Sequence, residues 1–231
     1  MKEYYLLLFM GVTIVLLFCT LSIGRMKDPL VKYAQRVLNV AILAVMARAV
    51  ATMTASEHTA NIAFSIFFAC IDWILLFFID FCFIYTNGNK NNIWYSILTG
   101  VVAFDSVSMV SNIFTGFIYS CYPIITDEGD FYYRTAHLWP FKVHLMLCYA
   151  MIVFIMYMLA KQAHTVSRSY RAKYVPIIIC FVIIVVWNAV YMFLEKKIDI
   201  SVFGYGILGL VLNYFALVYE PKDHSEKPTS N

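Results

Sequence analysis

Ionisable side chains interrupt several stretches of this sequence that are otherwise apolar. Asp72 and Asp105 stand among aliphatic and aromatic residues, and so do the cations Arg48 and Lys142, with His144 close behind. Opposite charges in such a setting can neutralise one another, and an arginine or lysine there can hold an anionic ligand. The residue types therefore point to ion pairing or to ligand binding, and the elements that carry them decide between the two.

Motifs for catalysis or metal binding are not found in the sequence. It contains neither HExxH nor GxSxG, and the flanks of Asp72 and Asp105 carry no supporting protease motif. The five histidines include no pair three or four residues apart, and the six cysteines form no CxxC pair. We predict that the chain is not an enzyme, holds neither a metal nor a cofactor, and uses its cysteines as small hydrophobic residues.

The composition defines the setting in which these side chains work. Of 231 residues, 62% are apolar and only 13% are charged, and the mean hydropathy is +0.74. A soluble domain has about a quarter of its residues charged. The composition therefore excludes a soluble enzyme, a disordered tail and a disulfide scaffold. The net charge of +3 is too small to argue for a nucleic-acid partner. What remains is a multi-pass protein of the cell membrane, with the lipid bilayer as its solvent.

Seven apolar stretches are each long enough to cross a bilayer, which takes about 20 helical residues. They are 4–24, 30–54, 60–85, 93–117, 137–160, 174–194 and 200–219. The fold class that we predict is an all-α membrane protein, a bundle of seven transmembrane helices. No linker breaks the chain, so we expect one domain over 1–221, followed by a polar cytoplasmic tail over 222–231. The segments between the spans, 118–136 included, are read as loops.

The distribution of Lys and Arg orients the bundle. With the N-terminus outside, eleven basic residues fall in inner segments and four in outer ones, while Arg48 and Lys142 lie within spans. Cytoplasmic loops carry an excess of basic residues. We therefore predict an outer N-terminus and a cytoplasmic C-terminus.

This topology places most of the polar groups of the spans between mid-membrane and the outer face. A charge at mid-bilayer costs about 2.5–3.5 kcal/mol on insertion scales, so each needs a partner or a function. The alternative is a set of structural ion pairs and hydrogen bonds between helices, which need not signal function. We favour a ligand pocket open to the outside. Its candidate residues are Arg48, Asp72, Asp105, Lys142, His144, Trp187, Asn188 and Tyr205.

Roles within this pocket follow from side-chain chemistry. Arg48 or Lys142 would hold an anionic group, and Asp105, Asn188 and Tyr205 would set its orientation. Trp187 and Trp139 would form part of the apolar wall of the pocket. The glycines of Gly204-Tyr-Gly206-Ile-Leu-Gly209 spell a dinucleotide-binding pattern, but they lie inside a span, where small residues let helices approach closely.

The amino-acid sequence of the last ninety or so residues resembles that of a known family. Ala136-His-Leu-Trp-Pro140 enters a span, a basic Ser167–Arg171 loop follows, and Tyr174-Val-Pro176 opens a span that carries Trp187-Asn188. The last span leaves through Tyr219-Glu-Pro221, and Trp94-Tyr95 and Phe104-Asp105 fit the fourth span. The chain resembles the N-terminal seven-helix sensor region of bacterial histidine kinases and diguanylate cyclases.

The resemblance implies a bundle that senses a small-molecule ligand and signals to a cytoplasmic output domain. The tail after Pro221 is too short for such a domain, so we expect either a fragment of a longer receptor or a bundle with a separate signalling partner. The sequence leaves the oligomeric state open, a homodimer included.

Two other functions remain open at the level of sequence. A transporter, or the membrane subunit of one, would need alternating access, and no internal repeat or broken helix indicates it. A polar path through Asp80 on the inner side would favour it. A purely structural subunit would seal its polar residues between helices.

Overall fold

A computed structural model describes residues 2–24, 29–86, 91–125, 129, 131–165, 174–193 and 202–218. Its elements are α1 (Lys2–Ile23), α2 (Pro29–Met53), α3 (Glu57–Tyr85), α4 (Asn92–Thr115), β1 (Tyr119–Ile125), β2 (Phe131–His137), α5 (Phe141–Thr165), α7 (Val175–Phe193) and α8 (Val202–Val218).

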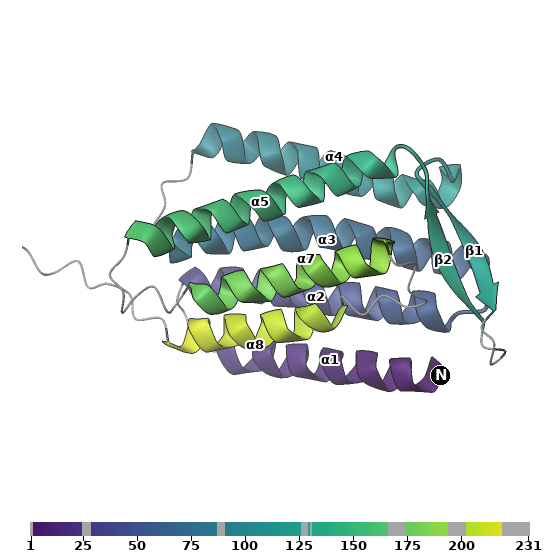
Figure 1. The fold of residues 1–231 in the computed structure, drawn as a ribbon, viewed down its shortest axis with the longest axis horizontal. Coiled ribbons are helices and arrows are strands. Elements are labelled where there is room, and N and C mark those ends of the chain that lie inside the picture. The colour runs from purple at the N-terminus through teal and green to yellow at the C-terminus, as the bar shows by residue number, and fades with distance from the viewer. Residues whose placement is uncertain are drawn as a thin grey trace, which may run out of the picture.

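The seven described helices run side by side along the long axis of the molecule (Figure 1). Five of them, α1 to α5, are long and apolar enough to cross a membrane, and α7 and α8 hold shorter apolar stretches. The predicted spans agree with these helices to within a few residues at almost every end. The larger differences are both at α5, which begins at Phe141 instead of residue 137 and ends at Thr165 instead of residue 160. The later start follows because His137 completes a strand.

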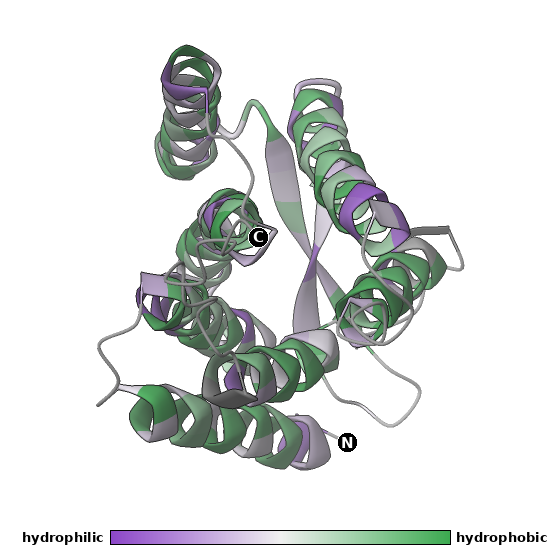
Figure 2. Cartoon of the chain, turned by 90° about the vertical axis from the view of Figure 1, so that its left-hand side faces the viewer, coloured by the Kyte–Doolittle hydropathy of each residue, from purple (hydrophilic) through white to green (hydrophobic). Residues whose placement is uncertain are grey.

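Helix α3 forms the centre of the bundle. It packs against α2, α4 and α5, and α1 packs against α2 and α8. Ser56 caps the first turn of α3, because its hydroxyl accepts a hydrogen bond from the Thr59 backbone N–H. Large apolar residues of the outer helices remain exposed, such as Phe104 and Phe114 on α4 and Met146 on α5. Viewed along the helices, apolar residues cover outward faces as well as inner ones, as a lipid environment requires (Figure 2).

The segment that we predicted to be a loop, 118–136, folds into an antiparallel β-hairpin. Strand β1 pairs with β2 in a register that joins Tyr119 to His137 and Ile125 to Phe131. Pro123 argues against a strand in the sequence, but a two-stranded sheet has only edge strands, which tolerate proline. The hairpin covers the end of the bundle at which the N-terminus lies (Figure 1).

Hydrogen bonds attach the hairpin to the helices. Tyr119 is fully buried, and its hydroxyl hydrogen-bonds with Ser65 and donates to the carbonyl of Asn61 on α3. The Tyr133 hydroxyl donates to the carbonyl of Ala55, between α2 and α3. The hairpin is therefore a fixed part of the bundle, and its strand β2 can contribute side chains to a site beneath it.

Candidate functional site

A cluster of buried polar side chains joins α3, α4 and α5. His144 Nδ1 lies 2.7 Å from Asp105 Oδ2 and 3.4 Å from Asp72 Oδ1. Ser106 donates a hydrogen bond to the other oxygen of Asp72, at 3.1 Å. Cys148 Sγ completes the cluster, 3.6 Å from Asp72 Oδ1 and 3.7 Å from His144 Nε2. One histidine thus meets two carboxylates and a thiol.

Helical spacing explains how the cluster assembles. His144 and Cys148 are four residues apart and so lie on the same face of α5, one turn above the other. Asp72 is at the middle of α3, the most buried helix, and is itself fully buried. Asp105 and Ser106 reach it from α4, whose other side faces outward. Each of the three helices supplies its polar residues at the same depth.

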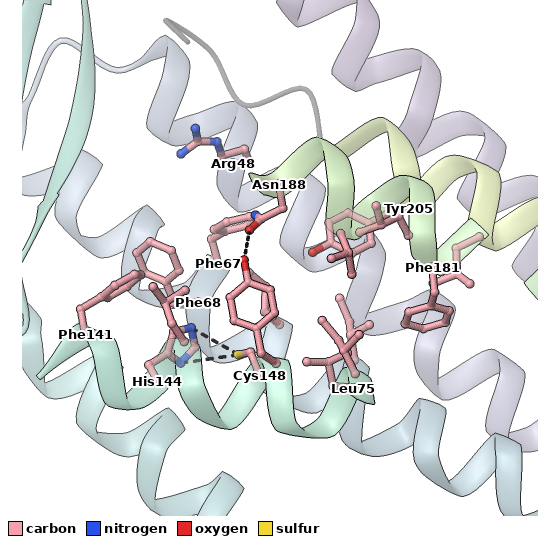
Figure 3. A pocket seen from close by; sticks show the side chains of 18 of the residues that line it. Arg48, Phe67, Phe68, Leu75, Phe141, His144, Cys148, Phe181, Asn188 and Tyr205 are labelled. Atoms are coloured by element: carbon pink, nitrogen blue, oxygen red, sulfur yellow. Dashed lines mark hydrogen bonds between the residues drawn. The ribbon is translucent and has the colours of Figure 1, made fainter. Parts of the chain in front are cut away.

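A pocket of about 100 Å³ lies beside this cluster, between α2, α3, α5, α7, α8 and strand β2. The wall is mainly apolar, with Phe67, Phe68, Leu75, Phe141 and Phe181 among its members (Figure 3). Its polar lining residues are Arg48, Thr135, His137, His144, Cys148, Tyr149, Asn188 and Tyr205. By the same measure a single water needs about 10–15 Å³, so the pocket has room for several waters or one small organic molecule.

Arg48 supplies positive charge at one side of this pocket. Its guanidinium carbon lies 4.9 Å from the ring centre of Phe64 and 5.6 Å from that of Phe67. Cation–π contacts of this kind hold the side chain in place as it leaves α2. Only 6% of Arg48 is exposed. In Figure 3, Arg48 and Asn188 lie on one side of the pocket, and His144 and Cys148 lie on the other.

Asn188 and Tyr205 bring the last two helices into the pocket. Tyr149 on α5 donates a hydrogen bond of 3.1 Å to the side-chain oxygen of Asn188 on α7 (Figure 3). Tyr205 on α8 is buried and lines the same space. A molecule in the pocket would therefore touch α7 and α8, the helices nearest the end of the chain.

Strand β2 contributes His137 at the covered end of the pocket. Although part of the residue is exposed, its ring stacks on Phe141 with the centroids 4.0 Å apart. Burial of the ring, and then the nearby charge of Arg134, hold the pKa of His137 below its ordinary value. The imidazole is therefore neutral near pH 7 and adds no second cation beside Arg48.

The predicted site residues fall into three groups. Arg48, His144, Asn188 and Tyr205 line the pocket, and Asp72 and Asp105 lie behind it in the cluster. Lys142 and Trp187 are exposed and do not line the pocket, and Trp139 is 73% exposed.

The aspartates, which by charge could pair with Arg48 and Lys142, have another partner. Among the residues that the structure describes, the ion pairs of Asp72 and Asp105 are to His144. The sequence fixes the depth of a side chain in the membrane but not the direction in which its helix turns it, and Lys142 is turned outward.

Other polar residues of the predicted spans have partners elsewhere. Asp80 accepts a hydrogen bond from the hydroxyl of Tyr95, so its position adds no weight to a transport path. Asn112 binds the start of the hairpin, and Asn213 accepts a hydrogen bond from Ser22. The side chain of Tyr191 lies outside the described residues.

Sequence reasoning missed Cys148, Tyr149 and His137 as members of the site. Cys148 does carry a signal, because it follows His144 by four residues and so lies on the same face of a helix. Tyr149 and His137 gave no signal, because the first depends on helix rotation and the second on a hairpin that was not predicted.

A family model described as the N-terminal 7TM region of histidine kinase matches residues 6–220. No curated protein matches the chain.

Proposed function

The chain belongs to the family of N-terminal seven-transmembrane regions of histidine kinases, and from this premise we propose that it binds a small anionic molecule in the Arg48 pocket. A region of this kind is a multi-pass membrane module for signal input. It is a sensor region rather than a catalytic domain, and it implies a link to a cytoplasmic output domain. The proposal adds the site and the chemistry of the ligand.

The observation that carries the proposal is the composition of the pocket. A mainly apolar wall encloses one buried guanidinium, with the amide of Asn188 and the hydroxyls of Tyr149 and Tyr205 around it. Ligand sites in proteins typically combine apolar walls with a few fixed polar groups. A short apolar body with a carboxylate at one end matches both parts, because the carboxylate can face Arg48.

Signal transfer would follow from the elements that form the pocket. We place the N-terminus and the hairpin outside, so the ligand enters the outer half of the bundle and the end of α8 leads to the cytoplasm. A ligand that fits one packing of α7 and α8 better than another shifts the population toward that packing. Residues 1–221 would form this sensor, and 222–231 a polar cytoplasmic tail.

The test uses short straight-chain carboxylates and their methyl esters as probes on the purified, detergent-solubilised chain. A ligand that binds the native state alone raises the melting temperature by mass action, corresponding to about 2.7 kcal/mol at a hundred times its Kd. We expect at least one carboxylate to stabilise the chain and its uncharged ester to do so far less.

Variants then locate the effect. Arg48→Gln should abolish the stabilisation by the carboxylate, because it removes the charge and leaves a shorter, uncharged polar side chain. Lys142→Gln is the matched control, since it removes a cation that is exposed outside the pocket. Stabilisation that survives in Arg48→Gln, or that the esters reproduce, would contradict the proposal.

A further inference from the structure

The cluster behind the pocket holds three different donor atoms in one place. A ring nitrogen of His144, the sulfur of Cys148 and a carboxylate oxygen of Asp72 all lie within 4.8 Å of one another. None of the three residues is more than 6% exposed. Nitrogen, sulfur and oxygen from neutral imidazole, thiolate and carboxylate are the ligands that Zn²⁺ takes in proteins.

Two of the distances among these atoms match those around a tetrahedral ion. With metal–ligand distances of about 2.0–2.3 Å, two ligands of a tetrahedral zinc lie roughly 3.3–3.8 Å apart. The sulfur of Cys148 is 3.6 Å from Asp72 Oδ1 and 3.7 Å from His144 Nε2. Two edges of such a tetrahedron are therefore already present, one between α3 and α5 and one within α5. The contact of His144 with Asp72 Oδ1, at 3.4 Å, is made by Nδ1, so binding through Nε2 requires the ring to turn toward Asp72.

Asp105 is placed to orient His144 for metal binding. Its Oδ2 is 2.7 Å from His144 Nδ1. A histidine that binds a metal through one nitrogen usually donates the N–H of the other to a carboxylate or carbonyl, which fixes the ring and its tautomer. With Nδ1 donating to Asp105, Nε2 is the nitrogen left for the ion, and it is also the one nearer to Cys148.

Charge and access also agree with a divalent ion. Cys148 gives up its thiol proton to solvent when its sulfur binds a metal. One thiolate and the Asp72 carboxylate then cancel the two positive charges, so the centre itself adds no net charge to the membrane interior, where charge is costly. His144 and Cys148 both line the pocket, so the fourth position of the ion can hold a water or a ligand there.

We propose that Asp72, His144 and Cys148 form a three-ligand site for Zn²⁺ or a similar borderline-soft divalent ion, with Asp105 as the residue that positions His144. This site goes beyond the proposed function, because a carboxylate could bind at Arg48 with or without it. The ion would link α3 to α5 and, through Asp105, to α4.

The first experiment reads the ligands directly with Co²⁺ as the probe. The full chain, stripped of metal by a chelator in detergent, is titrated with Co²⁺ and its absorption spectrum is recorded. We expect equimolar binding, intense visible bands of tetrahedral cobalt and a near-ultraviolet thiolate-to-cobalt charge-transfer band, all displaced by Zn²⁺. A spectrum of the folded wild-type chain without the thiolate band would overturn the proposal.

Variants separate ligands from the positioning residue. Cys148→Ser should lose the charge-transfer band, and Asp72→Asn should lose tight binding. Asp105→Asn should keep the band with an affinity lower by about 10–100-fold, the usual effect of removing such a support. Cys19→Ser is the control, since Cys19 is a buried cysteine of α1, which lines no part of the pocket.

Two further outcomes count against the site. Binding that is unchanged in Cys148→Ser would mean adventitious capture by exposed histidines such as His58. A lower melting temperature in all cluster variants with no metal bound by the wild type would mean a purely structural hydrogen-bonded cluster. If Cys148→Ser does not fold, the cobalt spectrum of the wild-type chain and its displacement by Zn²⁺ decide. Carboxylate stabilisation measured in the presence of chelator tests the Arg48 proposal separately.

Discussion

At the scale of single residues, Asn112 shows how a polar side chain in a spanning helix can serve structure alone. It is fully buried near the end of α4, and its amide donates to the carbonyl of Tyr119 at 2.9 Å. Its oxygen accepts from the backbone N–H of Ile118 at 2.7 Å. The side chain thus satisfies backbone groups at the start of the hairpin, where neither a helix nor the sheet can pair them.

We predict that Asn112→Ala lowers the stability of the chain markedly. The change leaves a backbone N–H and a carbonyl buried without partners, each at a cost of about 1–3 kcal/mol. Thermal unfolding in detergent should show a clear drop in melting temperature. Ser111→Ala is the control, because the exposed Ser111 hydroxyl donates its hydrogen bond to the Ser108 carbonyl of the same helix. Equal effects of the two changes would refute this role for Asn112.

The candidate site could be predicted in part from single residues. Charge in an apolar stretch identified Arg48, Asp72, Asp105 and His144, because such groups rarely stand at membrane depth without a partner or a task. Which of them meet depends on the rotation of each helix about its axis, and a span that is apolar nearly all round carries no signal for it. His144 therefore replaced Lys142 as the partner of the aspartates.

At the scale of elements, α8 depends on its glycines. A Cβ added at Gly204 would overlap the side chain of Ile184 on α7, and one at Gly209 would come within 2.6 Å of Leu16 Cδ2 on α1. The interpretation of these glycines as helix contacts is confirmed. The hairpin was missed because a segment between two spans was read as a connection, although its aromatic and β-branched residues favour strands.

We predict that Gly204→Ala destabilises the packing of α8 on α7, by about 1–3 kcal/mol, as overpacking of a tight core does. Gly206→Ala is the matched control in the same helix, since its added Cβ would make an ordinary contact with Val12 at 3.5 Å. That change should be neutral or slightly stabilising, because alanine favours a helix by about 1 kcal/mol over glycine. Thermal unfolding of both variants measures the difference.

The clash itself can be checked by relieving it. Ile184→Ala shortens the side chain that the new Cβ would meet, so the double variant Gly204→Ala/Ile184→Ala should lose less stability than the sum of the single changes. Strict additivity in this double-mutant cycle would show that the two helices do not meet there as the structure places them.

At the scale of the whole molecule, the direction of the bundle in the membrane determines what the pocket can sense. The hairpin and the N-terminus lie at one end (Figure 1), and the basic residues of the sequence gather in the segments predicted for the other. Orientation follows from this asymmetry of charge and not from the packing, which is the same in either direction. The sequence is therefore the better guide to it.

We predict that the loop between α2 and α3 faces the outside and the end of α5 faces the cytoplasm. Ala55 and Thr165 are exposed in these two places, so a cysteine can replace either without disturbing the core. The background is Cys121→Ser, because the other native cysteines are buried. A membrane-impermeant maleimide added to intact cells should label Ala55→Cys readily.

The same reagent should label Thr165→Cys only after the cells are permeabilised. The opposite pattern would mean that the bundle has the reverse orientation in the membrane. The Arg48 pocket would then lie in the cytoplasmic half of the membrane. In that case the pocket could still bind a carboxylate and the cluster could still bind a metal. The ligand would come from inside the cell, however, and α8 could no longer carry the signal inward.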